Sequence, residues 1–255
     1  MRVISFCADG IIDAADKGFY DWVSGQDADI ICIQNLKAQE HEIQADRFHP
    51  EGMYGYFFDN YEGKNGVGIY VRELPRAIMT GLGMTDRDIE ARYIQADFER
   101  VSIGCLLAPN AYGQDDNAQA DKMAFMDQYQ AHLNKIRHKR REYIICGSWF
   151  SAQTPQDIQH AKAAEGKPGF TLEESEWFDT LYRDAGYCDA FRRVNSDSDE
   201  FTWWPEGDRK NDGWRSDTQI VSEGLRQRVE YGFGYKNKAF SSHAPIVMDY
   251  DIELS

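Results

Sequence analysis

The stretch Tyr143-Ile144-Ile145-Cys146-Gly147-Ser148-Trp149-Phe150 joins a short apolar run to small and polar residues. Its first half, Tyr143–Cys146, is typical of a buried β-strand, because it is apolar, short and followed at once by a glycine. Other runs along the chain have the same character, and we expect each to form a strand. They are Arg2–Phe6, Ile30–Ile33, Gly66–Val71, Tyr93–Phe98, Ser102–Leu107, Asp217–Val221 and Ile246–Tyr250.

Between these runs, three segments carry apolar residues at helical spacing, namely Ile12–Ser24, Ala120–Ile136 and Glu173–Ala185. The last follows Thr171, which fits a helix N-cap with acidic residues in the first turn. Strands that alternate with helices indicate an α/β chain, and consecutive strands indicate hairpins within the sheets. The pattern predicts a single α/β domain over residues 1–255 and leaves the order of its layers open.

The composition bounds the class of protein. The chain has 255 residues and is 42% hydrophobic, which is enough for one large core or two small ones. No run approaches the ~18–20 apolar residues that span a bilayer, and the N-terminus lacks a signal-peptide pattern. We therefore expect a soluble cytoplasmic protein. The net charge of −15 argues against strong autonomous binding to DNA or RNA, since proteins that neutralise phosphates alone are usually basic.

The five cysteines show neither a CxxC pair nor zinc-ligand spacing with histidine. Most lie in the apolar runs, so we expect small core residues in a reducing compartment. They are Cys7, Cys32, Cys105, Cys146 and Cys188.

Several short motifs, taken in order, resemble those of the exonuclease III / apurinic-endonuclease family of phosphodiesterases. The resemblance runs nearly from end to end of the chain and implies a four-layer αββα sandwich of the DNase I type, formed by one domain over residues 1–255. The motifs that carry it are Ile4-Ser5-Phe6-Cys7, Ile33-Gln34-Asn35, Ala108-Pro109-Asn110, Cys146-Gly147-Ser148-Trp149-Phe150, Arg215-Ser216-Asp217 and Ser241-Ser242-His243-Ala244-Pro245.

The resemblance also implies a chemistry. In this family carboxylates hold a Mg²⁺ ion on the phosphate, an Asp orients the attacking water, and a His steered by an Asp contacts a phosphate oxygen. Asp217, His243 and Trp203 match that pattern. Six other positions do not match it. Cys7 stands where the family has an Asn, Asn35 where it has the metal-binding Glu, and Leu107 where it has a Tyr. Ser148 and Phe150 stand in place of the Asp and the Asn of one motif, and Ser242 in place of the Asp before the histidine.

These replacements lead us to expect a degenerate site without catalytic residues, bound metal or cofactor, and a chain that is not an enzyme. Asp217 and His243 then have a local structural role, since polar groups at strand ends are commonly satisfied there. The alternative is a divalent-metal-dependent phosphodiesterase or exonuclease III-like nuclease with residual activity, which uses Asp217 and His243.

Further segments, among them Lys139-Arg140-Arg141-Glu142-Tyr143 and Trp203-Trp204-Pro205, resemble a regulatory branch of the same family. The resemblance implies a non-catalytic translational co-repressor in carbon catabolite repression. Its partners are the RNA chaperone Hfq and A-rich leader segments of mRNA, in a ternary complex in which Hfq reads the RNA. A scaffold that contacts only protein is a third possibility.

The candidate contacts to RNA or Hfq are basic residues in an acidic chain. They are Lys135, Arg137, Lys139, Arg140 and Arg141, with a weaker second group of Arg226 and Arg228. The alternative is ordinary, because cations at the end of a helix also complement its dipole. A local positive patch remains the hypothesis to test.

Overall fold

The computed structural model describes residues 1–84 and 86–254. Its strands form two six-stranded sheets. The first has the order β11-β12-β1-β2-β4-β3, and the second β5-β6-β7-β8-β10-β9. The strands of the first sheet are β1 (Arg2–Cys7), β2 (Ile30–Gln34), β3 (Tyr54–Phe58), β4 (Val67–Val71), β11 (Val229–Gly234) and β12 (Ile246–Tyr250). Those of the second are β5 (Ala77–Thr80), β6 (Tyr93–Asp97), β7 (Val101–Leu107), β8 (Glu142–Ser148), β9 (Tyr187–Asp189) and β10 (Asp217–Ser222).

Each sheet has one parallel pair near its middle. In the first sheet β1 runs parallel to β2, with Val3 opposite Ile30. In the second, β7 runs parallel to β8, with Val101 opposite Glu142. The other pairs are antiparallel. Since parallel strands end at the same edge of a sheet, each sheet brings two strand ends together, and both pairs contribute to the site described below.

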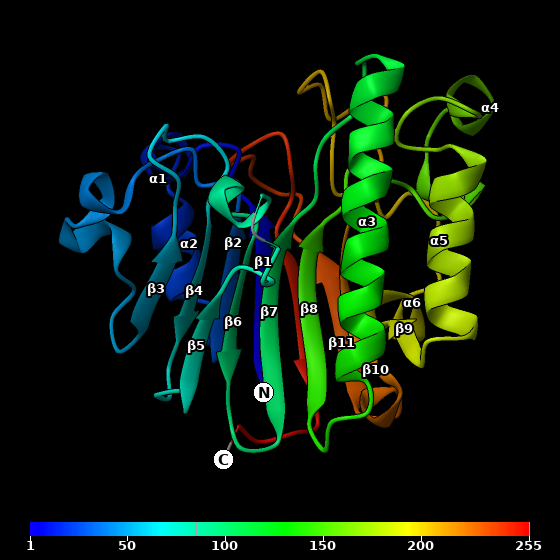
Figure 1. Cartoon of the computed structure of the whole chain (residues 1–255). Helices are drawn as coiled ribbons and strands as arrows, with labels where there is room; N and C mark the ends of the chain where they lie inside the picture. The colour runs from blue at the N-terminus through cyan, green and yellow to red at the C-terminus, as the bar shows by residue number, and fades with distance from the viewer. Residues whose placement is uncertain (85, 255) are drawn as a thin grey trace.

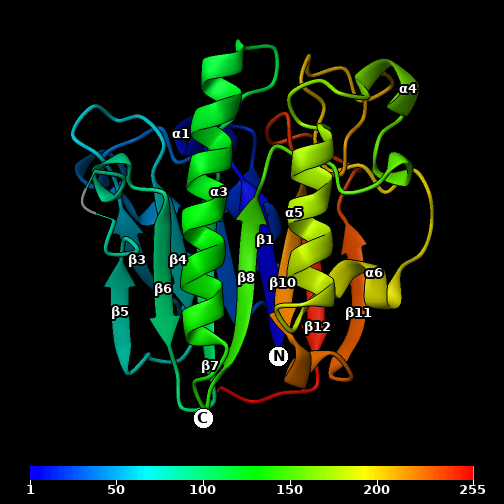
Figure 2. The ribbon, with the colours of Figure 1, turned by 45° about the vertical axis from the view of Figure 1, so that its right-hand side comes forward.

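The two sheets pack face to face over a shared apolar core, to which Val3, Ile69, Ile103 and Ile144 contribute from four different strands. Helices cover the two outer faces, so the layers run helix, sheet, sheet, helix, as the resemblance implied (Figures 1 and 2). The helices are α1 (Ile11–Asp16), α2 (Phe19–Ser24), α3 (Asp116–Ile136), α4 (Ala161–Ala164), α5 (Leu172–Arg183) and α6 (Ala190–Val194). Short 3₁₀ turns cover Glu40–Ile43, Asp46–Phe48, Asp88–Glu90, Pro155–Asp157 and Glu223–Leu225.

The eight strands expected from apolar runs are all present, with ends shifted by a residue or two. The helix predicted over Ile12–Ser24 is instead two helices, α1 and α2. The break lies at Gly18, whose φ of 87° belongs to the left-handed region that glycine adopts without a steric penalty. The predicted cap of α5 is confirmed. The Thr171 hydroxyl accepts a hydrogen bond from the Glu174 amide, and the Glu174 carboxylate accepts one from the Thr171 amide.

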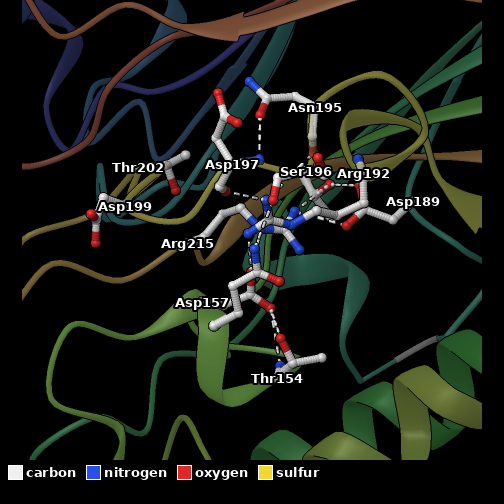
Figure 3. A network of polar contacts seen from close by, with 12 residues as sticks. Thr154, Asp157, Asp189, Arg192, Asn195, Ser196, Asp197, Asp199, Thr202 and Arg215 are labelled. Atoms are coloured by element: carbon white, nitrogen blue, oxygen red, sulfur yellow. Dashed lines mark hydrogen bonds and ion pairs between the residues drawn. The ribbon is translucent and has the colours of Figure 1, made fainter.

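A buried ionic network fixes the start of β10 (Figure 3). The Arg215 guanidinium donates to Asp157 at 2.6 Å and lies 2.8 Å from Asp189, while Arg192 also reaches Asp157 at 2.8 Å. Arg215 is only 3% exposed, so its charge depends on these two carboxylates. The network holds the backbone directly before Asp217.

All five cysteines are buried and unpaired, as expected. Within the described residues, no helix is both long and apolar enough to cross a bilayer.

Candidate active site

A cleft of about 590 Å³ opens at the edge of the sandwich where both parallel strand pairs end. Leu107 ends β7, and Asn35 directly follows β2. Clefts with a few convergent polar groups are the usual form of a small-molecule or substrate site. The lining residues are Asp9, Asn35, Lys37, Asn65, Arg92, Leu107, Ala108, Pro109, Asn110, Gln114, Ala118, Asp121, Phe150, Trp203, Pro205, Ser242 and His243.

His243 and Asp217 form the polar centre of this cleft. The Nδ1 atom of His243 lies 2.8 Å from Oδ2 of Asp217, and the two residues are 1% and 3% exposed. The Thr202 hydroxyl donates to the same carboxylate oxygen at 2.7 Å. The Ser241 hydroxyl accepts from the His243 amide, which fixes the backbone of the histidine. A histidine held in this way by a carboxylate has a fixed ring orientation.

Aromatic rings enclose the imidazole on two sides. Trp203 stacks on His243 with ring centroids 5.6 Å apart, and Phe150 meets it edge to face at the same centroid distance. Phe150 has a φ of 50°, an unusual conformation for a bulky residue. The buried ammonium of Lys122 donates to the Phe150 carbonyl at 2.8 Å and pairs with Glu174 at 2.7 Å. Lys122 and Glu174 therefore hold a strained segment that walls the site.

The immediate neighbours determine the charge of the imidazole. Burial alone would lower the pKa of His243, but the adjacent Asp217 carboxylate and the Cys7 thiol raise it to about 10. Burial raises the pKa of the Cys7 thiol, against the opposing effect of His243. The histidine is therefore a cation near neutral pH and suits an anionic ligand in the cleft.

Three further residues that line the cleft, Asp9, Asn35 and Lys37, interact with one another. The Asn35 amide nitrogen donates to Oδ1 of Asp9 at 3.0 Å, and the Lys37 ammonium lies 2.6 Å from the same oxygen. All three residues have positive φ values between 47° and 57°. Sequence reasoning identified Asn35 and missed the other two, although each follows a recognised motif within two residues.

The family implies a Mg²⁺ ion, and the residues present do not fit one. Mg²⁺ requires near-octahedral oxygen ligands, usually with one or two carboxylates. The carboxylates that line the cleft, Asp9 and Asp121, are already paired with Lys37 and with Arg87 at 2.7 Å. Asn35 turns its amide nitrogen, and not its oxygen, toward Asp9. The ammonium group of Lys37 therefore occupies the position beside Asp9 that a Mg²⁺ ion would need.

The structure brings together the eight positions that the resemblance assigned to the degenerate catalytic site. Asn35, Leu107, Phe150, Ser242 and His243 line the cleft. The remaining three lie buried beneath it: Asp217 faces Ser148 across the β8–β10 pair, and Cys7 lies close to both Asp217 and His243.

The basic candidates lie at the opposite end of the molecule. Arg141 directly precedes β8, whereas the cleft is at its far end, and the 21 residues of α3 span about 30 Å between the two (Figure 2). The second basic group, Arg226 and Arg228, lies at this end too. Glu142 and Gly224 line a surface hollow together with Arg137, and they line a neighbouring hollow together with Arg228. Several of the charges are paired: Arg141 with Asp97, Arg226 with Glu223, and Arg228 with Asp251. Lys135, Lys139 and Arg140 are exposed.

The two-sheet sandwich with a buried His–Asp pair at its cleft matches the fold of an established protein family. The chain belongs to the Endonuclease/Exonuclease/phosphatase family, whose model matches residues 13–237. It is 28% identical to the exodeoxyribonuclease of Bacillus subtilis over 99% of the chain and 100% of that protein. It is 30% identical to the DNA repair nuclease APEX1 of Danio rerio over 97% of the chain and 81% of that protein. Its fold matches an AP endonuclease from Archaeoglobus fulgidus with a TM-score of 0.88, at 20% identity and over 99% and 100% of the two chains.

These relatives contradict two of the sequence-based expectations. The prediction of a non-catalytic translational co-repressor and the prediction that the chain is not an enzyme are both wrong by this comparison, because proteins similar over nearly the whole chain are nucleases by name. Those predictions relied on the combined replacements at the site and on the resemblance of further segments to a regulatory branch of the family. The relatives favour the alternative, a nuclease.

Proposed function

We propose that this chain is a phosphodiesterase of the exonuclease III type that acts slowly on nucleic-acid backbones. The observation that carries the proposal is the buried His243–Asp217 pair, with Nδ1 and Oδ2 2.8 Å apart, at the edge of a polar cleft. The full-length similarity to the Bacillus subtilis exodeoxyribonuclease supports the same reaction class.

The cleft residues have separate roles in this proposal. Lys37 and Arg92 line the cleft and attract the phosphate. The His243 imidazole donates a hydrogen bond to a phosphate oxygen and stabilises the charge that develops there. Asp217 fixes the ring and balances its positive charge. Trp203 and Phe150 keep water away from this contact, which strengthens it.

The rate is expected to be low, because the site has few groups that can activate water. Ser148 and Ser242 offer hydroxyls where a general base would need a carboxylate or an imidazole, and Phe150 offers a ring. Loss of one such group commonly costs a factor of ~10² to 10⁴, and the losses are not additive.

The test is cleavage of end-labelled duplex DNA that carries an abasic site or a recessed 3′ end, with enzyme in excess. The unchanged protein should convert the substrate slowly, and His243→Ala should be slower by at least about a hundredfold. His138→Ala is the matched control, since His138 is exposed at the far end of α3. Equal rates for all three proteins would identify a contaminant and overturn the proposal.

The partners expected from the sequence stay predictions. We propose that the finer resemblance is to the catabolite repression control proteins (Crc), and that the partners to test are Hfq and A-rich mRNA. The expected contacts are the basic residues from Lys135 to Arg141, with weak or no nucleic-acid binding by this chain alone. A gel shift with this protein, with Hfq and with both checks the idea. It is supported if intact RNA is supershifted only by both proteins, and contradicted if no supershift forms.

A further inference from the structure

Three side chains of types that bind metal ions gather at the base of the cleft, and none of them belongs to the Asp9, Asn35 and Lys37 group. One donor atom each from Cys7, Asp217 and His243 lies within 4.8 Å of the other two. The three residues come from the end of β1, the start of β10 and the segment before β12. They are 1%, 3% and 1% exposed, so the sheet packing, and not a local sequence motif, brings them together.

Two buried polar atoms at this cluster have no hydrogen-bond partner among the described residues. One is Oδ1 of Asp217, the carboxylate oxygen that does not face the histidine. The other is the Ser148 hydroxyl, opposite Asp217 in the strand pair. Buried polar atoms are nearly always satisfied, so an unpaired carboxylate oxygen beside a thiol and an imidazole points to an absent ligand.

We propose that Cys7, Asp217 and His243 form a binding site for a borderline-soft divalent metal ion such as Zn²⁺. A thiolate, an imidazole and a carboxylate are the donors that Zn²⁺ takes, whereas Mg²⁺ prefers oxygen alone. Ligand distances of ~2.0–2.3 Å place tetrahedral donors roughly 3.5 Å apart, so small side-chain adjustments bring the cluster to bonding distance. Binding releases the Cys7 thiol proton and the imidazole proton at the coordinating nitrogen to solvent, and a water molecule completes the tetrahedral set of ligands.

Hydrogen bonds from neighbouring residues already orient two of the ligands. Thr202 donates to Oδ2 of Asp217, which leaves Oδ1 for the ion. The Ser241 hydroxyl donates to the Cys7 carbonyl at 2.8 Å and so fixes the end of β1. Such outer contacts commonly change metal affinity by ~10–100-fold. The site does not depend on the proposed hydrolysis, because it concerns binding alone.

The experiment is titration of chelator-treated, reduced full-length protein with Co²⁺ and then with Zn²⁺. We expect one equivalent of Co²⁺ to give a thiolate-to-cobalt charge-transfer band, which Zn²⁺ then abolishes. Cys7→Ser should lose the band, and both Cys7→Ser and His243→Gln should bind Zn²⁺ at least about tenfold more weakly in competition with a chromophoric chelator. Cys188→Ser, which changes another buried free thiol, should match the unchanged protein.

The spectrum of the unchanged protein with Co²⁺ tests the proposed metal site even if a variant fails to fold. Absence of a thiolate band in the unchanged protein overturns the proposal. A band that persists in Cys7→Ser also overturns it, because the sulfur ligand would then be another cysteine. Circular dichroism of each variant shows whether a loss of binding reflects loss of the ligand or loss of the fold.

Discussion

Lys122 shows how one buried charge determines the shape of the cleft. Its ammonium is fully buried and bonds to the Phe150 carbonyl, the Ser151 hydroxyl and the Glu174 carboxylate. Phe150, held at positive φ, then packs against His243. Breaking a buried pair leaves an uncompensated charge, and this costs more than the net value of the pair.

We therefore predict that Lys122→Met destabilises the protein by about 3–5 kcal/mol in urea unfolding. The double variant Lys122→Met/Glu174→Gln should recover part of this loss. The amide removes the unpaired charge and still accepts the bonds from the backbone amides of Gly169 and Thr171. A loss below about 1 kcal/mol in the single variant would contradict the account of the pair.

At the site, the sequence was informative about which residues meet and uninformative about how they interact. Cys7 and His243 were recognised from motifs more than two hundred positions apart, and the fold brings them together. The pairing of Lys37 with Asp9 depends on positive-φ loops, which the motifs did not indicate. Lys122 gave a signal that was missed, since it lies four residues before Met126 on the buried face of α3.

At the scale of elements, α5 depends on its N-terminal cap. The Thr171 hydroxyl accepts from the Glu174 amide at 3.2 Å and donates to the Glu174 carboxylate at 3.0 Å. We predict that Thr171→Ala lowers the free energy of unfolding by about 1 kcal/mol, whereas Thr171→Ser, which keeps the oxygen, loses little. Chemical denaturation measures both, and equal losses for the two variants would show that the hydroxyl is not responsible.

The Asp157 network gives a prediction about pH. Burial alone would raise the pKa of Asp157, but Arg215 and Arg192 outweigh it and hold the pKa below its usual range. A carboxylate whose pKa is lowered in the folded state adds stability above its unfolded pKa of about 3.9, and this stability is lost as the pH falls through the folded value.

Asp157→Asn should therefore be clearly less stable than the unchanged protein at pH 7. The difference between the two should shrink as the pH falls below about 4. Thermal unfolding followed from pH 7 to pH 2.5 checks this. A difference that stays constant over the whole range would mean that the charge of Asp157 does not matter.

The elements that escaped prediction are mostly edge strands. β3 and β11 are the two edge strands of the first sheet, and β5 and β9 are those of the second. β3, β5 and β11 are partly exposed and carry mixed residues, as in β11, where Glu230 and Tyr231 are exposed. β9 is buried but is only three residues long. Central strands such as β2 and β4 are buried on both faces and read as continuous apolar runs.

At the scale of the whole molecule, the four layers separate two functional regions. The cleft lies where the parallel strands end, and the exposed basic residues lie at the opposite end, about 30 Å away along α3. Membership in the family accounts for the sandwich and for the cleft. Residue replacements at the site, taken together, led to the prediction of an inactive protein, which the similarity to nucleases contradicts. The buried His243–Asp217 pair is intact, and it carries the proposed reaction.

The most direct test of that reaction is single-turnover cleavage of an abasic-site duplex by the His243→Ala variant, with and without added imidazole. We predict that the variant loses at least about a hundredfold in rate and that imidazole restores part of it, because the small ring can enter the space beside Asp217. His138→Ala should cleave at the unchanged rate with or without imidazole. Wild-type protein that leaves the duplex intact, or a His243→Ala variant as fast as wild type, would contradict the account.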